Sequence, residues 1–259
     1  MRRTFDFSGK NILVTGASSG IGMAVADSFA AANAELTILA DRDEVHETGD
    51  MLSIKHGRKI NALQCDITDR ESVSHALQSF SQIDVLINNA GLEFITPILQ
   101  NGDKVEETFR RITDINIMGT YYVTRDAVKV MPAGSSIIVT ASIWSKTAVA
   151  GFGAYCASKH ANLGFMRSLA QELGPNDITV NAICPGLTRT IPAMRSIKEE
   201  AERSKRTEQQ VLDELLEVQA LPGVMEPEDL ASSYLFLASE YARNISGQSL
   251  HVDRGAFMD

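Results

Sequence analysis

The chain lacks long apolar runs, paired cysteines and an excess of basic residues. Its longest unbroken apolar run is five residues, Tyr234 to Ala238, whereas a membrane-spanning helix needs about 20. The segment that follows Arg2 and Arg3 has no apolar core of the kind found in signal peptides. We therefore expect a cytoplasmic protein that does not bind a membrane.

Basic residues are outnumbered, because 24 Lys and Arg face 33 Asp and Glu, a formal charge of −9. A protein that binds the phosphate backbone needs a basic field, so this balance argues against nucleic acid as a partner. Cysteine is scarce and its number is odd, with Cys65, Cys156 and Cys184 at no metal-like spacing. Buried free thiols are expected, with no metal site and no disulfide framework.

Short Val- and Ile-rich runs alternate with longer stretches of helical spacing. The strand-sized runs are Asn11–Thr15, Leu36–Ala40, Ile60–Gln64, Val85–Ile87, Ser136–Thr140, Thr179–Ile183 and Gln248–Val252. The helical stretches include Met23–Ala32, Ser72–Phe80, Val105–Met131, Ala154–Leu173 and Glu228–Leu237. This order predicts an α/β protein, residues 1–259 forming a single domain with a doubly wound parallel sheet covered by helices on both faces.

One segment, residues 191–226, departs from the alternation because it is long and charged. Thr207 and Gln210 form a capping-box pattern, and an amphipathic stripe follows them. Two interpretations stay open: a solvated helix pair, or a lid inserted over a substrate pocket.

A glycine cluster follows the first predicted strand and opens a helix. It reads Gly16-Ala-Ser18-Ser19-Gly20-Ile21-Gly22, a GxxxGxG spacing. Glycines there permit a tight turn and let backbone N–H groups approach a pyrophosphate at a helix N-terminus. The strand, loop and helix together indicate a Rossmann-type dinucleotide site.

The second predicted strand ends at Asp41, 19 positions beyond Gly22, close to the spacing of about 20 expected for a ribose-binding acid. A carboxylate there accepts hydrogen bonds from a free ribose hydroxyl and repels a 2′-phosphate. NAD is therefore favoured. Arg42 could instead recruit that phosphate, which keeps NADP as the alternative.

Further motifs follow in order along nearly the whole chain, and with them the sequence resembles the short-chain dehydrogenase/reductase family. They are Thr15 to Gly22, Asp66, Asn88-Asn89-Ala90-Gly91, Asn116, Ser142, Tyr155 with Lys159, and Pro185-Gly186 followed by Thr188. Within the family, residues 191–226 look like the 3-hydroxybutyrate and polyol dehydrogenase branches. The resemblance implies a homotetramer built on the Val105–Met131 and Ala154–Leu173 regions, although Arg254 stands where the family usually has Gly.

Tyr155 and Lys159 are four positions apart on a predicted helix, so both side chains reach one ligand. A free tyrosine has a pKa of about 10, and a nearby ammonium lowers it towards the range needed for acid/base catalysis. The resemblance implies that Tyr155 exchanges the proton with substrate and that Lys159 binds the nicotinamide ribose. Ser142 would hold the substrate oxygen, and Asn116 would position a water in the proton relay.

The resemblance also implies the remaining cofactor contacts. Asp66 and Ile67 would flank the adenine, Asn89, Ala90 and Gly91 would line the passage under the adenosine ribose, and Pro185, Gly186 and Thr188 would hold the nicotinamide end.

The substrate positions differ from those of the hydroxybutyrate enzymes. Where those enzymes hold a carboxylate with Gln, His and Lys, this chain has Glu93, Trp144 and Phe152. Glu93 would repel an acid, and Asn88 to Glu93 resembles bacterial glucose dehydrogenases, in which this acid faces the sugar. A sugar or polyol is one interpretation. The other is an apolar pocket for a hydrophobic alcohol or ketone, with Glu93 in solvent.

We therefore expect an NAD-dependent oxidoreductase that transfers a hydride between nicotinamide and a secondary alcohol or ketone, with a polyol or sugar slightly favoured. The alternatives are an NADP-dependent reductase of an apolar ketone and a dinucleotide-binding regulator without catalysis. Such regulators usually lose the Tyr or the Lys, and both Tyr155 and Lys159 are present.

Overall fold

A single parallel sheet of seven strands forms the centre of the computed structural model, which describes residues 5–99 and 102–258. The strand order is β3-β2-β1-β4-β5-β6-β7, and each neighbouring pair is parallel. The strands are β1 (Asn11–Thr15), β2 (Glu35–Ala40), β3 (Asn61–Gln64), β4 (Val85–Asn88), β5 (Ser136–Thr140), β6 (Thr179–Pro185) and β7 (Ser249–Val252). The predicted fold class is confirmed, because the order reverses between β1 and β4 as in a doubly wound sheet.

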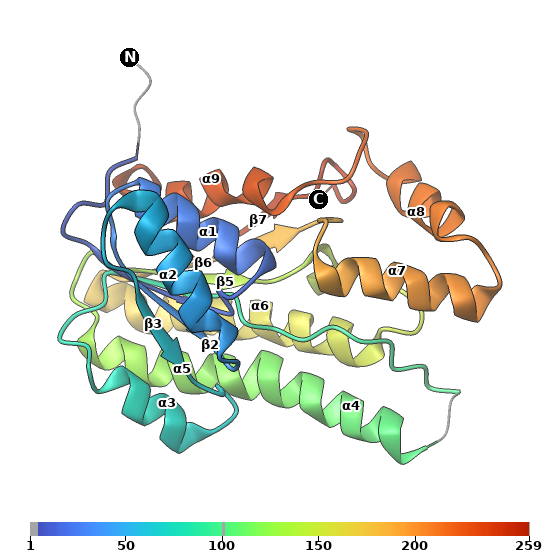
Figure 1. The fold of residues 1–259 in the computed structure, drawn as a ribbon, viewed down its shortest axis with the longest axis horizontal. Coiled ribbons are helices and arrows are strands. Elements are labelled where there is room, and N and C mark those ends of the chain that lie inside the picture. Colours follow the sequence, from blue (N-terminus) through green and yellow to red (C-terminus); the bar gives the residue numbers. More distant parts are fainter. Residues whose placement is uncertain (1–4, 100–101, 259) are drawn as a thin grey trace.

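Helices cover both faces of this sheet (Figure 1). They are α1 (Gly20–Ala31), α2 (Glu44–His56), α3 (Arg70–Leu77), α4 (Asp103–Thr113), α5 (Thr120–Ala127), α6 (Gly153–Leu173), α7 (Ile191–Ser204), α8 (Glu208–Glu217) and α9 (Pro227–Ala238). Helices α1, α2 and α9 contribute to one apolar core, and α3, α5 and α6 contribute to the other.

Successive strand residues enter opposite cores because side chains alternate along a strand. Ile12 and Val14 of β1 pack towards α1 and α9, whereas Leu13 between them packs on the other face. The five inner strands, β2, β1, β4, β5 and β6, are largely buried on both sides, which explains their nearly continuous apolar sequences. The three cysteines are buried and free, as predicted.

The long helix expected over Val105–Met131 is interrupted. A π-helical turn, η1 (Asp114–Gly119), separates α4 from α5, and a short 3₁₀ turn, η2 (Val128–Val130), follows α5. Asn116, in the π turn, is fully buried and binds the backbone of Leu92 with its side chain. Periodicity could not reveal this turn, because its cause is a contact with a segment 24 residues away.

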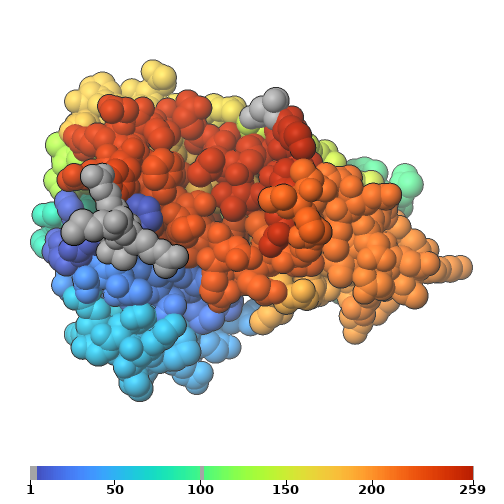
Figure 2. Space-filling model, turned by 90° about the horizontal axis from the view of Figure 1, so that it is seen from above, coloured from blue at the N-terminus to red at the C-terminus, as the bar shows by residue number. Residues whose placement is uncertain are grey.

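The charged segment after β6 forms a helical hairpin, α7 and α8. Thr190 caps α7 by accepting from the Ala193 N–H at 3.3 Å, and Thr207 with Gln210 forms the predicted capping box of α8. The hairpin has a small core of its own, centred on Ile197, Ala201 and Val211. Figure 2 shows it protruding from one end of the molecule, in orange.

Candidate active site

A cavity of about 1030 Å³ opens where β1, β2, β4, β5 and β6 end, and α7 and α8 form part of its wall. This is the edge at which open α/β sheets bind ligands. Most of the predicted cofactor residues line it, namely Gly16, Ser18, Ser19, Gly20, Ile21, Asp41, Arg42, Asp66, Ile67, Asn89, Ala90, Gly91, Tyr155, Lys159, Pro185, Gly186 and Thr188. Two predicted residues, Gly22 and Asn116, do not line the cavity and support its walls from behind.

The glycine loop between β1 and α1 is shaped by close backbone approach. Gly16 has a φ of +64°, and a Cβ there would lie 2.6 Å from the Cα of Ala90. At Gly22 a Cβ would lie 2.2 Å from the carbonyl oxygen of Gly16. The loop therefore needs glycine at both positions, and it leads into the N-terminus of α1, where N–H groups favour an anion.

Asn89 ties this loop to the end of β4. Its side-chain Nδ2 donates to the carbonyls of Thr15 and Gly16, each at 3.1 Å. The Thr15 hydroxyl accepts in turn from the N–H groups of Asn89 and Ala90, at 3.0 and 3.1 Å. The loop is thus held by buried and half-buried hydrogen bonds before any ligand binds.

At one end of the cavity, polar side chains follow the ends of strands β2 and β3. Asp41 and Arg42 are both exposed there, directly after β2. Burial of Asp66 acts to raise the pKa of its carboxyl, but hydrogen bonds from Thr68 and the nearby Arg111 guanidinium together hold that pKa below its usual value. Arg111, on α4, lies 3.4 Å from Asp66. The motifs did not indicate it, because it comes from a helix with no signature at that point.

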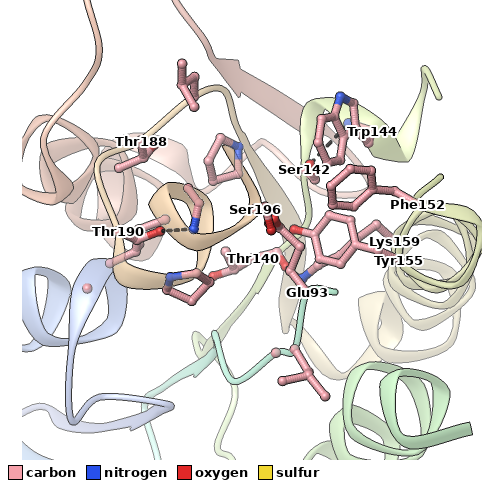
Figure 3. A pocket seen from close by; sticks show the side chains of 18 of the residues that line it. Glu93, Thr140, Ser142, Trp144, Phe152, Tyr155, Lys159, Thr188, Thr190 and Ser196 are labelled. Atoms are coloured by element: carbon pink, nitrogen blue, oxygen red, sulfur yellow. Dashed lines mark hydrogen bonds between the residues drawn. The ribbon is translucent and has the colours of Figure 1, made fainter. Parts of the chain in front are cut away.

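Tyr155 and Lys159 lie together at the other end of the cavity, near Ser142 (Figure 3). The Lys159 Nζ is 5.6 Å from the centre of the Tyr155 ring and donates to the carbonyl oxygen of Thr140 at 2.7 Å. Ser142 lies two positions after the last residue of β5. Its Oγ accepts a hydrogen bond from the Trp144 N–H at 3.1 Å. The three predicted side chains therefore converge on one point.

Burial dominates the electrostatics of this cluster. It raises the pKa of Tyr155, and the Glu93 carboxylate raises it further, while the Ser142 hydroxyl acts in the opposite direction. It also lowers the pKa of Lys159 to about 8. The charged forms of both groups are costly here. The predicted lowering of the Tyr155 pKa is therefore wrong in net direction, because burial and the Glu93 carboxylate outweigh the neighbouring Lys159.

Asn116 lies behind this cluster. Its Oδ1 accepts from the Leu92 N–H at 2.7 Å, and its Nδ2 donates to the Leu92 carbonyl at 3.0 Å and to the Ser158 hydroxyl at 2.9 Å. A Cβ on Gly91 would lie 3.4 Å from Asn116 and 3.5 Å from Lys159. Asn116 therefore fixes the backbone that passes beside the lysine.

Aromatic side chains form one wall of the inner cavity. Trp144 and Phe152 have ring centroids 4.9 Å apart, and Trp144 meets Tyr155 edge-on at 5.9 Å. Glu93 lies near Tyr155 in this part of the cavity (Figure 3). Burial raises the pKa of its carboxyl, while the charges of Arg195 and Lys159 act to lower it. Glu93 is half-buried and lines the cavity, so both interpretations of the substrate stay open.

Helix α7 contacts the segment that carries Glu93. The Arg195 guanidinium lies 3.7 Å from the centre of the Phe94 ring and donates to the Glu93 carbonyl oxygen. Ser196, 5% exposed, lies beside Glu93 (Figure 3). Arg195 and Ser196 belong to no motif, because nothing in the sequence of a charged helix indicates which residues face the cavity.

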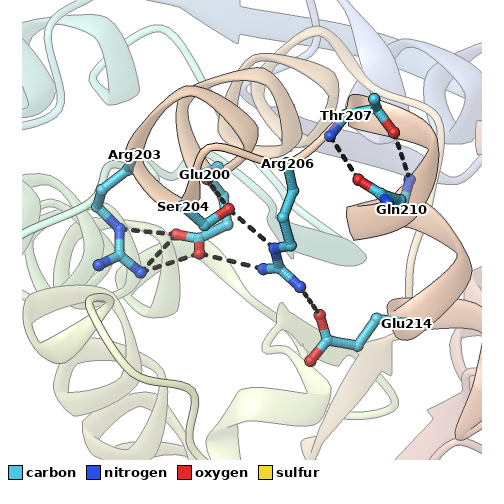
Figure 4. Close-up of polar contacts among 7 residues, drawn as sticks. All are labelled: Glu200, Arg203, Ser204, Arg206, Thr207, Gln210 and Glu214. Atoms are coloured by element: carbon cyan, nitrogen blue, oxygen red, sulfur yellow. Dashed lines mark hydrogen bonds and ion pairs between the residues drawn. The ribbon is translucent and has the colours of Figure 1, made fainter.

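An ion-pair network joins α7 to α8 at the cavity wall (Figure 4). Glu200 pairs with Arg203 at 2.7 Å and with Arg206 at 3.4 Å. Arg206 also pairs with Glu214 of α8 and donates to the Ser204 hydroxyl at 2.9 Å. These contacts and the small apolar core hold the two helices as one unit.

The comparisons with known proteins agree with this geometry. Residues 16–256 match the family model described as enoyl-(acyl carrier protein) reductase. The chain is 33% identical over 257 residues to momilactone A synthase of Oryza sativa subsp. japonica, covering 95% of this chain and 89% of that protein. The chain belongs to the short-chain dehydrogenase/reductase family.

Two further family members show the range of substrates. The 3α-hydroxysteroid dehydrogenase of Mediterraneibacter gnavus is 32% identical over 255 residues, covering 95% of this chain and 96% of that protein. The structure of L-sorbose reductase from Gluconobacter frateurii, complexed with NADPH and L-sorbose, has a TM-score of 0.88 at 28% identity and covers 99% of both chains. This short-chain dehydrogenase/reductase is thus an NAD(P)-dependent oxidoreductase that acts on alcohol or ketone groups.

Residues 5–99 and 102–258 contain no helix long and apolar enough to cross a membrane. The same ranges contain no group of three or more His, Cys, Asp or Glu side chains that could hold a metal ion.

Proposed function

We propose that this enzyme interconverts a secondary alcohol and a ketone on a sugar or polyol, with NAD as the preferred cofactor. The observation that carries the proposal is Glu93, a half-buried carboxyl that lines the cavity beside Tyr155. A buried carboxyl needs hydrogen-bond partners, and the vicinal hydroxyls of a sugar supply them. An acidic substrate would meet repulsion at the same point.

The opposite wall suits the same substrate. Trp144 and Phe152 present apolar ring surface, which packs against the C–H groups of a sugar ring while polar groups bind its hydroxyls. Ser196 of α7 would add a hydroxyl beside Glu93. We infer that residues 191–226 act as a lid, since α7 contributes directly to this end of the cavity.

The residues present fit a dinucleotide. The glycine loop leaves no room for a Cβ at Gly16 or Gly22, and the cavity runs from Asp41 to Tyr155. Asp41 would accept hydrogen bonds from the adenosine ribose and repel a 2′-phosphate, which favours NAD. Arg42 is exposed beside it, and the NADPH in the L-sorbose reductase complex keeps NADP as the alternative.

When bound, the nicotinamide supplies or accepts the hydride. Tyr155 would exchange the proton with the substrate oxygen, and Ser142 would donate a hydrogen bond to that oxygen as charge develops on it. Lys159 would bind the nicotinamide ribose with its ammonium group. Asn116 would hold the Gly91 to Glu93 backbone beside the lysine and position a water there.

The proposal extends to the oligomeric state of the enzyme and its cellular location. Phe109 and Met118 of the α4–η1 region and Tyr121 of α5 are exposed apolar side chains, and Tyr121 lies 6.2 Å from Phe165 of α6. This surface supports the homotetramer implied by the family, which sedimentation analysis would test. We also propose that the enzyme works in the cytoplasm.

A substrate panel at fixed NAD concentration tests the proposal. We expect reduction of NAD with sugars or polyols to exceed that with apolar alcohols of similar size. The reverse preference would favour the second candidate, an apolar alcohol or ketone held by Trp144 and Phe152. Tight NADH binding without turnover on any member of a broad panel would instead favour a regulator.

A further inference from the structure

A buried tyrosine outside the motifs lies next to the catalytic cluster. Tyr234 of α9 is 0% exposed, and its hydroxyl is 2.8 Å from the Thr140 Oγ1 at the end of β5. Burial raises the pKa of Tyr234, so its phenol stays neutral. A phenylalanine would fill the same apolar space, so the hydroxyl must be explained by what it binds.

The direction of this hydrogen bond follows from its neighbours. The Asn89 Nδ2 faces two carbonyls, which turns its Oδ1 towards Thr140 as an acceptor. The Thr140 hydroxyl has one proton and donates it to that Oδ1 at 3.3 Å. Tyr234 must therefore donate to Thr140. The chain runs from Tyr234 through Thr140 and Asn89 to the glycine loop.

The backbone of the same threonine holds the catalytic lysine. The Lys159 Nζ donates to the Thr140 carbonyl at 2.7 Å, and Lys159 is only 3% exposed. Lys159 comes from α6, whose apolar residues pack on one face of the sheet, whereas Tyr234 belongs to the core on the other face. Thr140 is the point at which the two faces meet.

We propose that Tyr234 is a positioning residue for Lys159. By donating to Thr140 from the opposite face, it fixes the orientation of the β5 end, and the Thr140 carbonyl then fixes the ammonium that would bind the nicotinamide ribose. This proposal rests on the function proposed for Lys159. Without the Tyr234 hydroxyl, the Thr140 hydroxyl would have only Asn89 as a hydrogen-bond partner and would rotate more freely.

Fluorescence titration of the full-length protein with NADH, and competition with ADP, test the proposal without a known substrate. Tyr234→Phe keeps the ring and removes the donor, and the loss of one hydrogen bond acting through Thr140 is expected to weaken NADH about three- to tenfold. ADP lacks the nicotinamide ribose, so its affinity should stay within about twofold. Tyr122→Phe, on α5, is the matched control and should change neither.

Two double-variant comparisons test whether the effect of Tyr234→Phe on NADH affinity acts through Thr140 and Lys159. Tyr234→Phe should have no further effect in a Thr140→Val background or in a Lys159→Ala background, since both remove the contact through which it acts. Thr140→Ser keeps the hydroxyl and should retain NADH affinity. Thermal unfolding of each variant shows whether it is folded.

The outcomes separate the two proposals. Unchanged NADH affinity in Tyr234→Phe overturns the positioning role, and so does an equal loss for NADH and ADP, which indicates general damage to the nucleotide site. If Lys159→Ala itself leaves NADH affinity unchanged, the role proposed for Lys159 fails instead.

Discussion

The two ends of the cavity are built differently. The end at which we propose that the nucleotide binds consists of strand ends and a glycine loop, tied together by Asn89 and packed on the two main cores. The proposed substrate end combines Glu93, Trp144 and Phe152 with helix α7 from a hairpin that has its own small core. Backbone therefore shapes one end, and side chains from distant segments shape the other.

This difference explains how one fold serves many substrates. A change of side chain at the substrate end alters which molecule binds and leaves the sheet untouched, whereas a Cβ at Gly16 would collide with Ala90. The names of two relatives, a steroid dehydrogenase and a sorbose reductase, show that members of the family act on different substrates. Variants that affect only one end of the cavity are the most direct test of whether the two ends act independently.

Tyr155→Phe should have the largest effect. It removes the proton-exchanging hydroxyl while keeping the ring that packs on Trp144, so we expect turnover to fall by about 10² to 10⁴. NADH binding, measured by fluorescence titration, should stay within a few-fold. Retained turnover would contradict the assignment of Tyr155, and loss of NADH binding would show that the two ends are not separable.

Glu93→Gln should affect the substrate end alone. It keeps the size of the side chain and removes the charge that binds hydroxyls, and we expect kcat/KM for the best sugar or polyol to fall about 10- to 100-fold, as for hydrogen bonds to charged groups. The KM for NAD should not change. An equal activity of wild type and variant would remove Glu93 from substrate recognition.

Asp41→Ala should affect the nucleotide end alone. Loss of the carboxylate removes a ribose hydrogen bond and the repulsion of a 2′-phosphate, so the ratio of NAD to NADP efficiency should fall about tenfold or more. The relative rates on different sugars should stay constant. An unchanged cofactor ratio would show that Asp41 does not reach the ribose.

The burial of Glu93 also predicts a pH dependence of stability. Its pKa is raised in the folded state, so the folded protein binds more protons than the unfolded chain between the ordinary glutamate value and the raised one. The contribution of Glu93 to the free energy of unfolding is therefore lost as the pH rises through that window. Urea denaturation at several pH values should show Glu93→Gln gaining stability relative to wild type as the pH rises. A constant difference would mean that Glu93 is not desolvated.

Short backbone motifs specify the strand ends and the glycine loop, so these features could be predicted from the sequence. The structure brings these features to one cavity, with the Tyr155–Lys159 pair, four positions apart on α6, at its other end. The family resemblance supplied roles that no local pattern could. The capping box at Thr207 could also be predicted, since the four residues from Thr207 to Gln210 suffice to define it.

The rest depends on contacts between distant segments. The π turn at Asn116 exists because its side chain binds Leu92, and periodicity instead predicted one continuous helix. The contact of Arg195 with Phe94 spans about a hundred residues. In the sequence Tyr234 only begins an apolar run, and the position of Thr140 in the structure shows what its hydroxyl binds.

Arg206→Gln should have the smallest effect and tests whether the hairpin moves as a unit. Arg206 links Glu200 of α7 to Glu214 of α8 at the cavity wall, and exposed ion pairs of this kind change equilibria only slightly. We expect the KM for a sugar or polyol to rise roughly two- to fivefold, since α7 also carries Ser196 to the substrate. NADH affinity should not change, because the nucleotide end does not depend on the hairpin core.

Arg110→Gln, which breaks a similar surface pair with Glu106 on α4, is the matched control. An equal rise in KM for both variants would show that loss of surface charge, and not the link between α7 and α8, is responsible.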